Sequence, residues 1–139
     1  MAVRAVRGAT QLDRDEREHL LHRVGELVRV VMECNDLTAD DVVSIVFTAT
    51  DDLTSDYPAY AARTIGLVDV PLLCAREVDV DGGMPRVVRL LAHVETDRAR
   101  DEITHVYLHG AAALRRDLTH VRAIPDPPAP AGGGHEARE

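Results

Sequence analysis

The sequence predicts one α+β domain, in which a mixed sheet of about five strands carries one long helix and one short helix. Residues 13–35 have the apolar spacing of an amphipathic helix, whereas five other stretches have the length and apolar, β-branched composition of strands. The strand-like stretches between residues 70 and 114 are joined by short connections. Short connections favour antiparallel pairs, so we expect a mixed sheet rather than an all-parallel one.

The first strand and the long helix account for residues 1–35. In "MAVRAVRGAT", Val3, Ala5 and Arg7 share one face because side chains alternate along a strand. The helix is predicted between Asp13 and Asn35, with Asp13 as its N-cap and "CND" as its stop. Its apolar stripe consists of Leu20, Leu21, Val24, Leu27, Val28 and Val31.

The middle of the chain alternates between strands and turns. "LTADD" (37–41) predicts a short capped turn, and the near-continuous apolar run "VVSIVFTAT" (42–50) predicts a central strand. Pro58 suits the first turn of a short helix that runs to about Ile65 and ends at Gly66. "VPLLCA" (70–75) predicts another buried strand, and "DVDGGMP" (79–85) a turn.

The last two predicted strands are "RVVRLLAHVET" (86–96) and "ITHVYLHGAAALRR" (103–116). After Leu118 the chain is rich in Pro, Gly and Ala without apolar periodicity, so residues 1–118 are predicted to form the domain and 119–139 a disordered tail. One long helix covers one face of such a sheet. The other face also needs cover, and self-association is its simplest source.

The composition argues against several classes of partner. The formal net charge of −8 disfavours nucleic acid and anionic membranes, and three tyrosines with one phenylalanine offer few surfaces for base stacking. No apolar run is long enough to span a membrane, and the first residues lack the apolar core of a signal peptide. The two cysteines, Cys34 and Cys74, suit a reducing compartment, so we expect a cytoplasmic protein.

Arg89 interrupts an apolar strand, and a buried guanidinium needs an anion because it cannot lose its proton. Glu77 could be that anion, as a purely structural ion pair, and Cys74 could be an ordinary core residue. The polar residues within or beside strands are Arg7, Cys74, Glu77, Arg89, Tyr107 and Arg115. Together they indicate a site with several cations and one carboxylate that binds a small polyanion.

The usual signatures of nucleophilic, phosphate-loop and metal chemistry are missing from the sequence. His19 and His22 lie three residues apart on the predicted long helix, but no third ligand accompanies them. They are interpreted as part of a solvated face. No metal and no cofactor is therefore predicted.

Five stretches of the sequence together match a known family. They are "VRGAT" (6–10), "TATDDL" (48–53), "YPAYAAR" (57–63), "VPLLCAREVDVDGGMPRVVRLL" (70–91) and "HVYLHGAAALRRDL" (105–118). These motifs resemble the monofunctional chorismate mutases of the trimeric pseudo-α/β-barrel class. Their order and spacing match the family over residues 1 to about 118. The resemblance implies a homotrimer with its helices outside a barrel-like core, and active sites in the clefts between subunits.

The resemblance also implies roles for individual residues. Arg89 matches the arginine beside the ether oxygen and a carboxylate of chorismate, and Arg7 matches a carboxylate-binding arginine. Glu77 and Cys74 match residues that meet the ring hydroxyl. The other expected substrate-binding positions are Tyr107, Arg115 and Leu73, with Tyr57 and Arg63 contributed by the adjoining subunit.

The implied reaction converts chorismate to prephenate on the route to phenylalanine and tyrosine. It is an intramolecular [3,3] rearrangement that requires neither proton transfer nor a covalent intermediate, so a missing nucleophile–base pair is expected. Two alternatives keep the arginines: a non-catalytic trimeric module that binds a small carboxylate, and a trimer of the imine-deaminase type. The C-x-x-E pair of Cys74 and Glu77 favours the mutase, because a simple carboxylate clamp does not require it.

Overall fold

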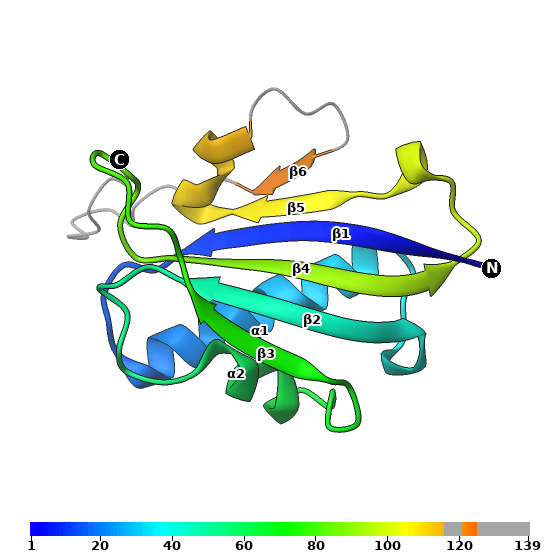
Figure 1. Cartoon of the computed structure of the whole chain (residues 1–139), viewed down its shortest axis with the longest axis horizontal. Helices are drawn as coiled ribbons and strands as arrows, with labels where there is room; N and C mark the ends of the chain where they lie inside the picture. Colours follow the sequence, from blue (N-terminus) through cyan, green and yellow to red (C-terminus); the bar gives the residue numbers. More distant parts are fainter. Residues whose placement is uncertain (116–120, 125–139) are drawn as a thin grey trace, which may run out of the picture.

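A computed structural model describes residues 1–115 and 121–124, which form one mixed sheet with its two α-helices on the same side (Figure 1). The strands are β1 (Ala2–Gln11), β2 (Val42–Ala49), β3 (Leu72–Arg76), β4 (Val87–Thr96), β5 (His105–Leu108) and β6 (Val121–Ile124). The helices are α1 (Arg17–Cys34) and α2 (Pro58–Thr64), with 3₁₀ turns η1 (Ala39–Asp41), η2 (Arg100–Glu102) and η3 (His109–Arg115). The α+β class predicted from the sequence is confirmed.

The sheet is mixed, with strand order β3-β2-β4-β1-β5-β6. The central strand β4 pairs antiparallel with both β1 and β2, and the β1–β4 register runs from Ala2 opposite Thr96 to Gln11 opposite Val87. The remaining pairs, β1–β5, β2–β3 and β5–β6, are parallel. This pairing sets the two longest strands side by side at the middle of the sheet (Figure 1).

Helix α1 packs closely against the sheet. Its predicted apolar stripe is buried, apart from Leu21, which is partly buried against the same core. Gly8 of β1 permits the close approach, because a Cβ atom there would lie 3.2–3.3 Å from side-chain atoms of Leu27, Val31 and Leu90. The prediction of Asp13 as N-cap is wrong. Glu16 caps the helix by accepting a hydrogen bond from the backbone N–H of His19 at 3.1 Å.

Two strands differ from their predictions. β3 lies at the edge of the sheet and is partly exposed, because only β2 pairs with it. The last predicted strand is much shorter, since β5 ends at Leu108 and η3 follows. His109 has a φ of 55°, which breaks the extended backbone. Ala111 of η3 then packs with Ala9 and Tyr107 over one end of the sheet.

The predicted tail contains a strand that the composition does not reveal. Val121–Ile124 form β6, which pairs parallel with β5 along its whole length. A β-branched residue at each end suits a strand, and the free edge of β5 supplies the backbone partners. The tail prediction is wrong for these four residues. Its other positions, 119, 120 and 125–139, lie outside the described residues.

The face of the sheet opposite α1 and α2 carries exposed apolar side chains. Val3 of β1 is 58% exposed and Leu91 of β4 is 38% exposed. Both belong to the odd-numbered positions of their strands, whereas Val6, Leu90 and their even-numbered neighbours face the helices. Among residues 1–115 and 121–124, no helix is long and apolar enough to cross a membrane.

Candidate active site

Four predicted site residues line one cavity of about 400 Å³ on the face away from the helices. Arg7 comes from β1, Arg89 from β4 and Tyr107 from β5, while Glu77 directly follows β3. The register explains the convergence, since Ala9 lies between Arg89 and Tyr107 on neighbouring strands. The other lining residues are Gly8, Val46, Thr48, Leu90 and Leu91.

Two guanidinium groups in this cavity have unsatisfied nitrogens. The Nε atoms of Arg7 and Arg89 are buried, and neither has a hydrogen-bond partner within the described residues. Arg89 Nε lies 3.1 Å from Oε2 of Glu77, but its N–H is not aligned with that oxygen. The ion pair therefore exists, as the structural alternative expects, yet it leaves donors of Arg89 unused. Two arginines with unsatisfied Nε groups beside one cavity indicate a binding site for an anion.

Glu77 is held from two sides. Its backbone N–H donates to the carbonyl of Ala49 at 2.9 Å, which extends the β2–β3 pairing by one residue. Its Oε2 accepts a hydrogen bond of 2.7 Å from Oγ1 of Thr48. Thr48, Val46 and Gly8 are absent from the set predicted from the sequence. The signal for Thr48 was its polar side chain in the apolar run of β2, directly opposite Arg89.

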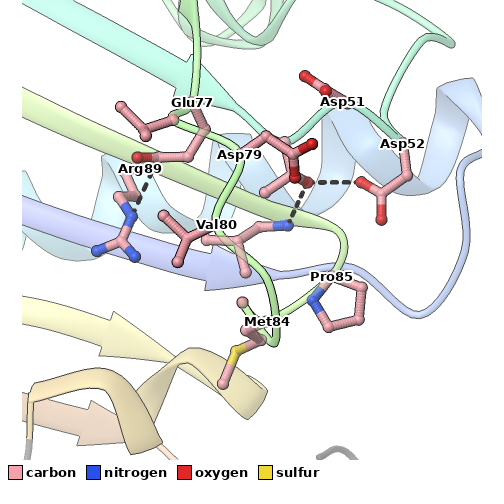
Figure 2. Close-up of a pocket in the computed structure, with 12 residues that line it drawn as sticks. Asp51, Asp52, Glu77, Asp79, Val80, Met84, Pro85 and Arg89 are labelled. Carbon is pink, nitrogen blue, oxygen red and sulfur yellow. Dashed lines mark hydrogen bonds and ion pairs between the residues drawn. The ribbon is translucent and has the colours of Figure 1, made fainter.

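A second cavity of about 370 Å³ adjoins the first, and Glu77 and Arg89 line both. Figure 2 shows Asp51, Asp52 and Asp79 grouped on the side of this second cavity that is away from Arg89. Asp52 is engaged structurally, because its oxygens accept from the backbone N–H of Arg86 at 3.0 and 3.2 Å. The carboxylates make this second cavity unfavourable for an anion, so the first cavity is the candidate active site.

Four other predicted residues do not line the candidate cavity. Cys74 faces the helices, where its Sγ accepts a hydrogen bond from the backbone N–H of Ala59 at 3.4 Å. Tyr57 precedes α2 and is 73% exposed, Arg63 is exposed in the last turn of α2, and Leu73 of β3 is 61% exposed. Within one chain, the predicted site therefore divides into two groups of residues.

The remaining predicted residue, Arg115, is the last residue of η3. η3 starts directly after β5 and packs against the end of the sheet that holds the cavity, through Ala111 beside Tyr107. The described residues include no cluster of three or more histidine, cysteine or acidic side chains that could hold a metal ion.

The fold and the cavity define a small α+β protein whose sheet presents two arginines, one carboxylate and one phenol to a single cavity, an arrangement suited to an anionic ligand. Residues 3–118 match the family model for chorismate mutase type I. The chain therefore belongs to the type I chorismate mutase family, which confirms the resemblance seen in the sequence.

Individual relatives agree with the family match. The chain is 45% identical to chorismate mutase AroH of Thermus thermophilus over 117 residues, 84% of this chain and 96% of the relative. It is 39% identical to chorismate mutase AroH of Bacillus subtilis over 120 residues, which cover 86% of this chain and 94% of the relative. A solved chorismate mutase from Clostridium thermocellum superimposes with a TM-score of 0.77 at 38% identity, covering 78% of this chain and 97% of that chain.

Proposed function

We propose that this enzyme, a chorismate mutase by family, converts chorismate to prephenate in the cavity lined by Arg7, Glu77, Arg89 and Tyr107. The observation that carries the assignment of the site is that Arg7 and Arg89 line one cavity, while the buried Nε of each has no aligned partner in the described residues. Chorismate is a dianion, and arginines bind carboxylates with directed hydrogen bonds.

The rearrangement breaks one C–O bond while it forms one C–C bond within the same molecule. No proton moves, so the site needs no general base, nucleophile or metal. It must hold the flexible substrate with its two reacting ends in contact, and this positional restraint can supply a large part of the rate enhancement. Arg7 and Tyr107, on adjacent strands β1 and β5, would bind the carboxylates from one side of the cavity.

Arg89 has the second task. Negative charge grows on the ether oxygen as the C–O bond lengthens, and a fixed cation in a shielded cavity stabilises that charge more than water does. Arg89 is suited to this role because Glu77 approaches its Nε, so its terminal nitrogens can face the substrate. Glu77 would accept a hydrogen bond from the ring hydroxyl and so fix the orientation of the ring.

We further propose that the enzyme is a homotrimer with each active site between two subunits. The face of the sheet away from the helices is uncovered in one chain and exposes the apolar side chains of Val3 and Leu91. Cys74, Tyr57, Arg63 and Leu73 also lie outside the cavity of their own chain. A neighbouring subunit that covers the open face could bring its own copies of these residues to the cavity.

The reaction belongs to the biosynthesis of phenylalanine and tyrosine, and we place it in the cytoplasm. Cys34 and Cys74 are both free thiols, which suits a reducing compartment. Neither residue needs oxidation for the proposed mechanism.

The decisive experiment follows the ultraviolet absorbance of chorismate with wild type and the Arg89→Ala variant. Wild type should consume chorismate and form prephenate, whereas Arg89→Ala should be slower by about 10²–10³-fold or more, as when one oxyanion donor is removed. Arg89→Lys should restore little activity if two-pronged geometry matters. Arg29→Ala, which removes an exposed arginine of α1, is the matched control and should keep wild-type activity.

Each contrary result has a distinct meaning. Near-normal turnover by Arg89→Ala would remove Arg89 from the mechanism. If wild type binds chorismate but leaves it unchanged, the chain is a carboxylate-binding module on the mutase fold.

A further inference from the structure

Thr48 joins the two charged residues of the cavity through one oxygen atom. It lies on β2 directly opposite Arg89 of β4, and both side chains line the candidate cavity. Its Oγ1 donates a 2.7 Å hydrogen bond to Oε2 of Glu77. The same Oε2 lies 3.1 Å from Nε of Arg89. One carboxylate oxygen therefore contacts both a hydroxyl and a guanidinium, and the described residues offer no hydrogen-bond partner to Oε1.

The contact between Glu77 and Arg89 is not the arrangement that these two groups favour. A carboxylate and a guanidinium form their strongest pair when two N–H groups meet two oxygens. Here the Arg89 N–H at Nε is not aligned with Oε2, even though the two atoms lie 3.1 Å apart. Glu77 is 22% exposed and sits at the start of a loop, so its side chain has room to turn toward Arg89.

We propose that Thr48 is a positioning residue, whose hydroxyl prevents Glu77 from closing a two-pronged ion pair with Arg89. With Oε2 held by Thr48, Oε1 of Glu77 and the terminal nitrogens of Arg89 stay available to the substrate. Without the hydroxyl, Glu77 turns onto Arg89, and the ion pair must break before the cation can stabilise the transition state. The inference rests on the proposed function, since it assigns these groups to chorismate.

The test compares kcat and KM of Thr48→Val and Thr48→Ser. Valine keeps the branched shape without the hydroxyl, and we expect kcat to fall about 10- to 100-fold, the range for losing one hydrogen bond to a charged group. KM should change less, because the arginines still bind the carboxylates. Thr48→Ser keeps the hydroxyl and should restore most of the lost kcat. Thr48→Ala should reproduce the loss if Thr48→Val folds poorly.

A matched control removes a hydroxyl elsewhere on the sheet. Thr96 ends β4, and its Oγ1 accepts a 3.2 Å hydrogen bond from the backbone N–H of Arg98. Thr96→Val should leave kcat within about twofold of wild type. Thr96 lies at the other end of β4 from Arg89 and lines neither of the two cavities that Arg89 lines. Unfolding midpoints of all variants show whether a lost kcat reflects lost folding.

A double-mutant cycle with Glu77→Gln separates a positioning role from a structural one. If Thr48 acts through the Glu77 carboxylate, Thr48→Val should change kcat less than about twofold in the Glu77→Gln background, since coupled residues are not additive. An equal loss in both backgrounds would overturn the positioning role. A fully active Thr48→Val would overturn it too, while leaving the mutase function intact. A wild type that does not convert chorismate would overturn both.

Discussion

His19 illustrates how a single backbone contact fixes a charge state. Its Nε2 accepts a 2.9 Å hydrogen bond from the backbone N–H of Asp13, which only the neutral imidazole can do. Burial, followed by the positive charges of Arg23 and Arg14, lowers the pKa of His19 from 6.5 to about 4. The residue is thus a structural acceptor at the start of α1, where the sequence indicated a solvated face.

Stability should therefore fall as the pH drops from about 6.5 to about 4. In this window the unfolded chain binds a proton at His19 and the folded chain does not, so protonation favours unfolding; below about 4 both states are protonated. Urea unfolding at pH 7, 5.5 and 4.5 measures the change. His19→Gln removes the titrating group and should show a weaker pH dependence between 6.5 and 4. His22→Gln, on the same helix, should retain the dependence of wild type because His19 is intact.

Individual residues were predictable where one local rule dominates. Arg89 stood out because a guanidinium in an apolar strand requires an anion, and the structure places Glu77 beside it. Asp13 was misjudged because N-caps are recognised by residue type, whereas its carboxylate forms an ion pair with Arg23 at 3.2 Å. Thr48 was missed although it is a polar residue within an apolar run, since its role depends on a hydrogen bond to Glu77, 29 residues away along the chain.

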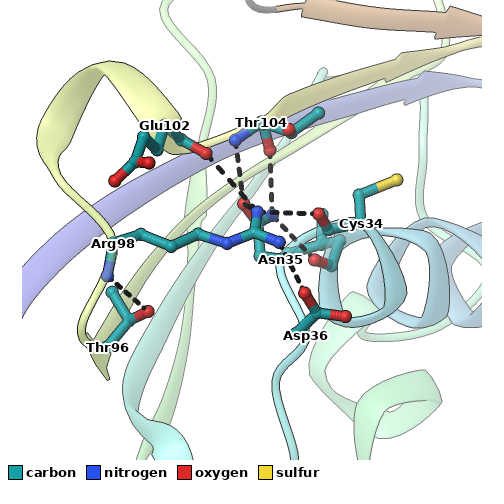
Figure 3. Close-up of polar contacts among 8 residues, drawn as sticks. Cys34, Asn35, Asp36, Thr96, Arg98, Glu102 and Thr104 are labelled. Carbon is teal, nitrogen blue, oxygen red and sulfur yellow. Dashed lines mark hydrogen bonds and ion pairs between the residues drawn. The ribbon is translucent and has the colours of Figure 1, made fainter.

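The C-terminus of α1 is fixed by a polar network that the sequence does not reveal (Figure 3). Asn35, which is 1% exposed, donates from Nδ2 to the carbonyls of Val31 at 2.8 Å and Thr104 at 2.9 Å. Its Oδ1 accepts from the backbone N–H of Thr104 at 2.8 Å. Arg98 adds a 2.9 Å bond to the carbonyl of Cys34. The network joins the end of α1 to the segment that leads into β5.

Asn35→Ala should destabilise the protein by about 3 kcal/mol, because it leaves several buried backbone groups without their partners. The matched change is Asp36→Asn, which removes the charge of an exposed carboxylate that lies 2.6 Å from Arg98. Asparagine tolerates the positive φ of 54° at position 36, so the backbone is not strained by the change. That variant should lose less than about 1 kcal/mol, as exposed ion pairs contribute little. Urea unfolding curves compare the two. Equal losses would contradict the importance assigned to Asn35.

Elements were predictable in proportion to the length of their pattern. The bounds of α2, β1, β2 and β4 follow the predicted stretches closely, since periodicity, Pro58 and Gly66 all act locally, whereas α1 starts later than predicted and only its end agrees. The limits of β5 and β6 could not be predicted, because they depend on the positive φ of His109 and on pairing along the edge of the sheet. The burial of β3 was overestimated for the same reason: strand order decides which strand lies at the edge.

At the scale of the whole molecule, one chain brings four of the nine predicted site residues to one cavity. The sheet brings Arg7, Glu77, Arg89 and Tyr107 together by register alone. No periodicity or spacing could show that Cys74 faces α2, because its position depends on how α2 packs against β3. In the proposed trimer, the second group of residues would come from the neighbouring subunit and complete the site.

The open face of the sheet provides the test of that assembly. Val3→Glu should dissociate the proposed trimer, because it would place a second carboxylate directly opposite Glu95 of β4 on the face that the neighbouring subunit covers. Sedimentation velocity should show a trimer for wild type and for the control Val3→Ile, but monomers for Val3→Glu. The monomer should keep its circular dichroism, since Val3 is 58% exposed in one chain, yet lose mutase activity. A wild type that is monomeric and fully active would show that Arg7, Glu77, Arg89 and Tyr107 suffice without a neighbour.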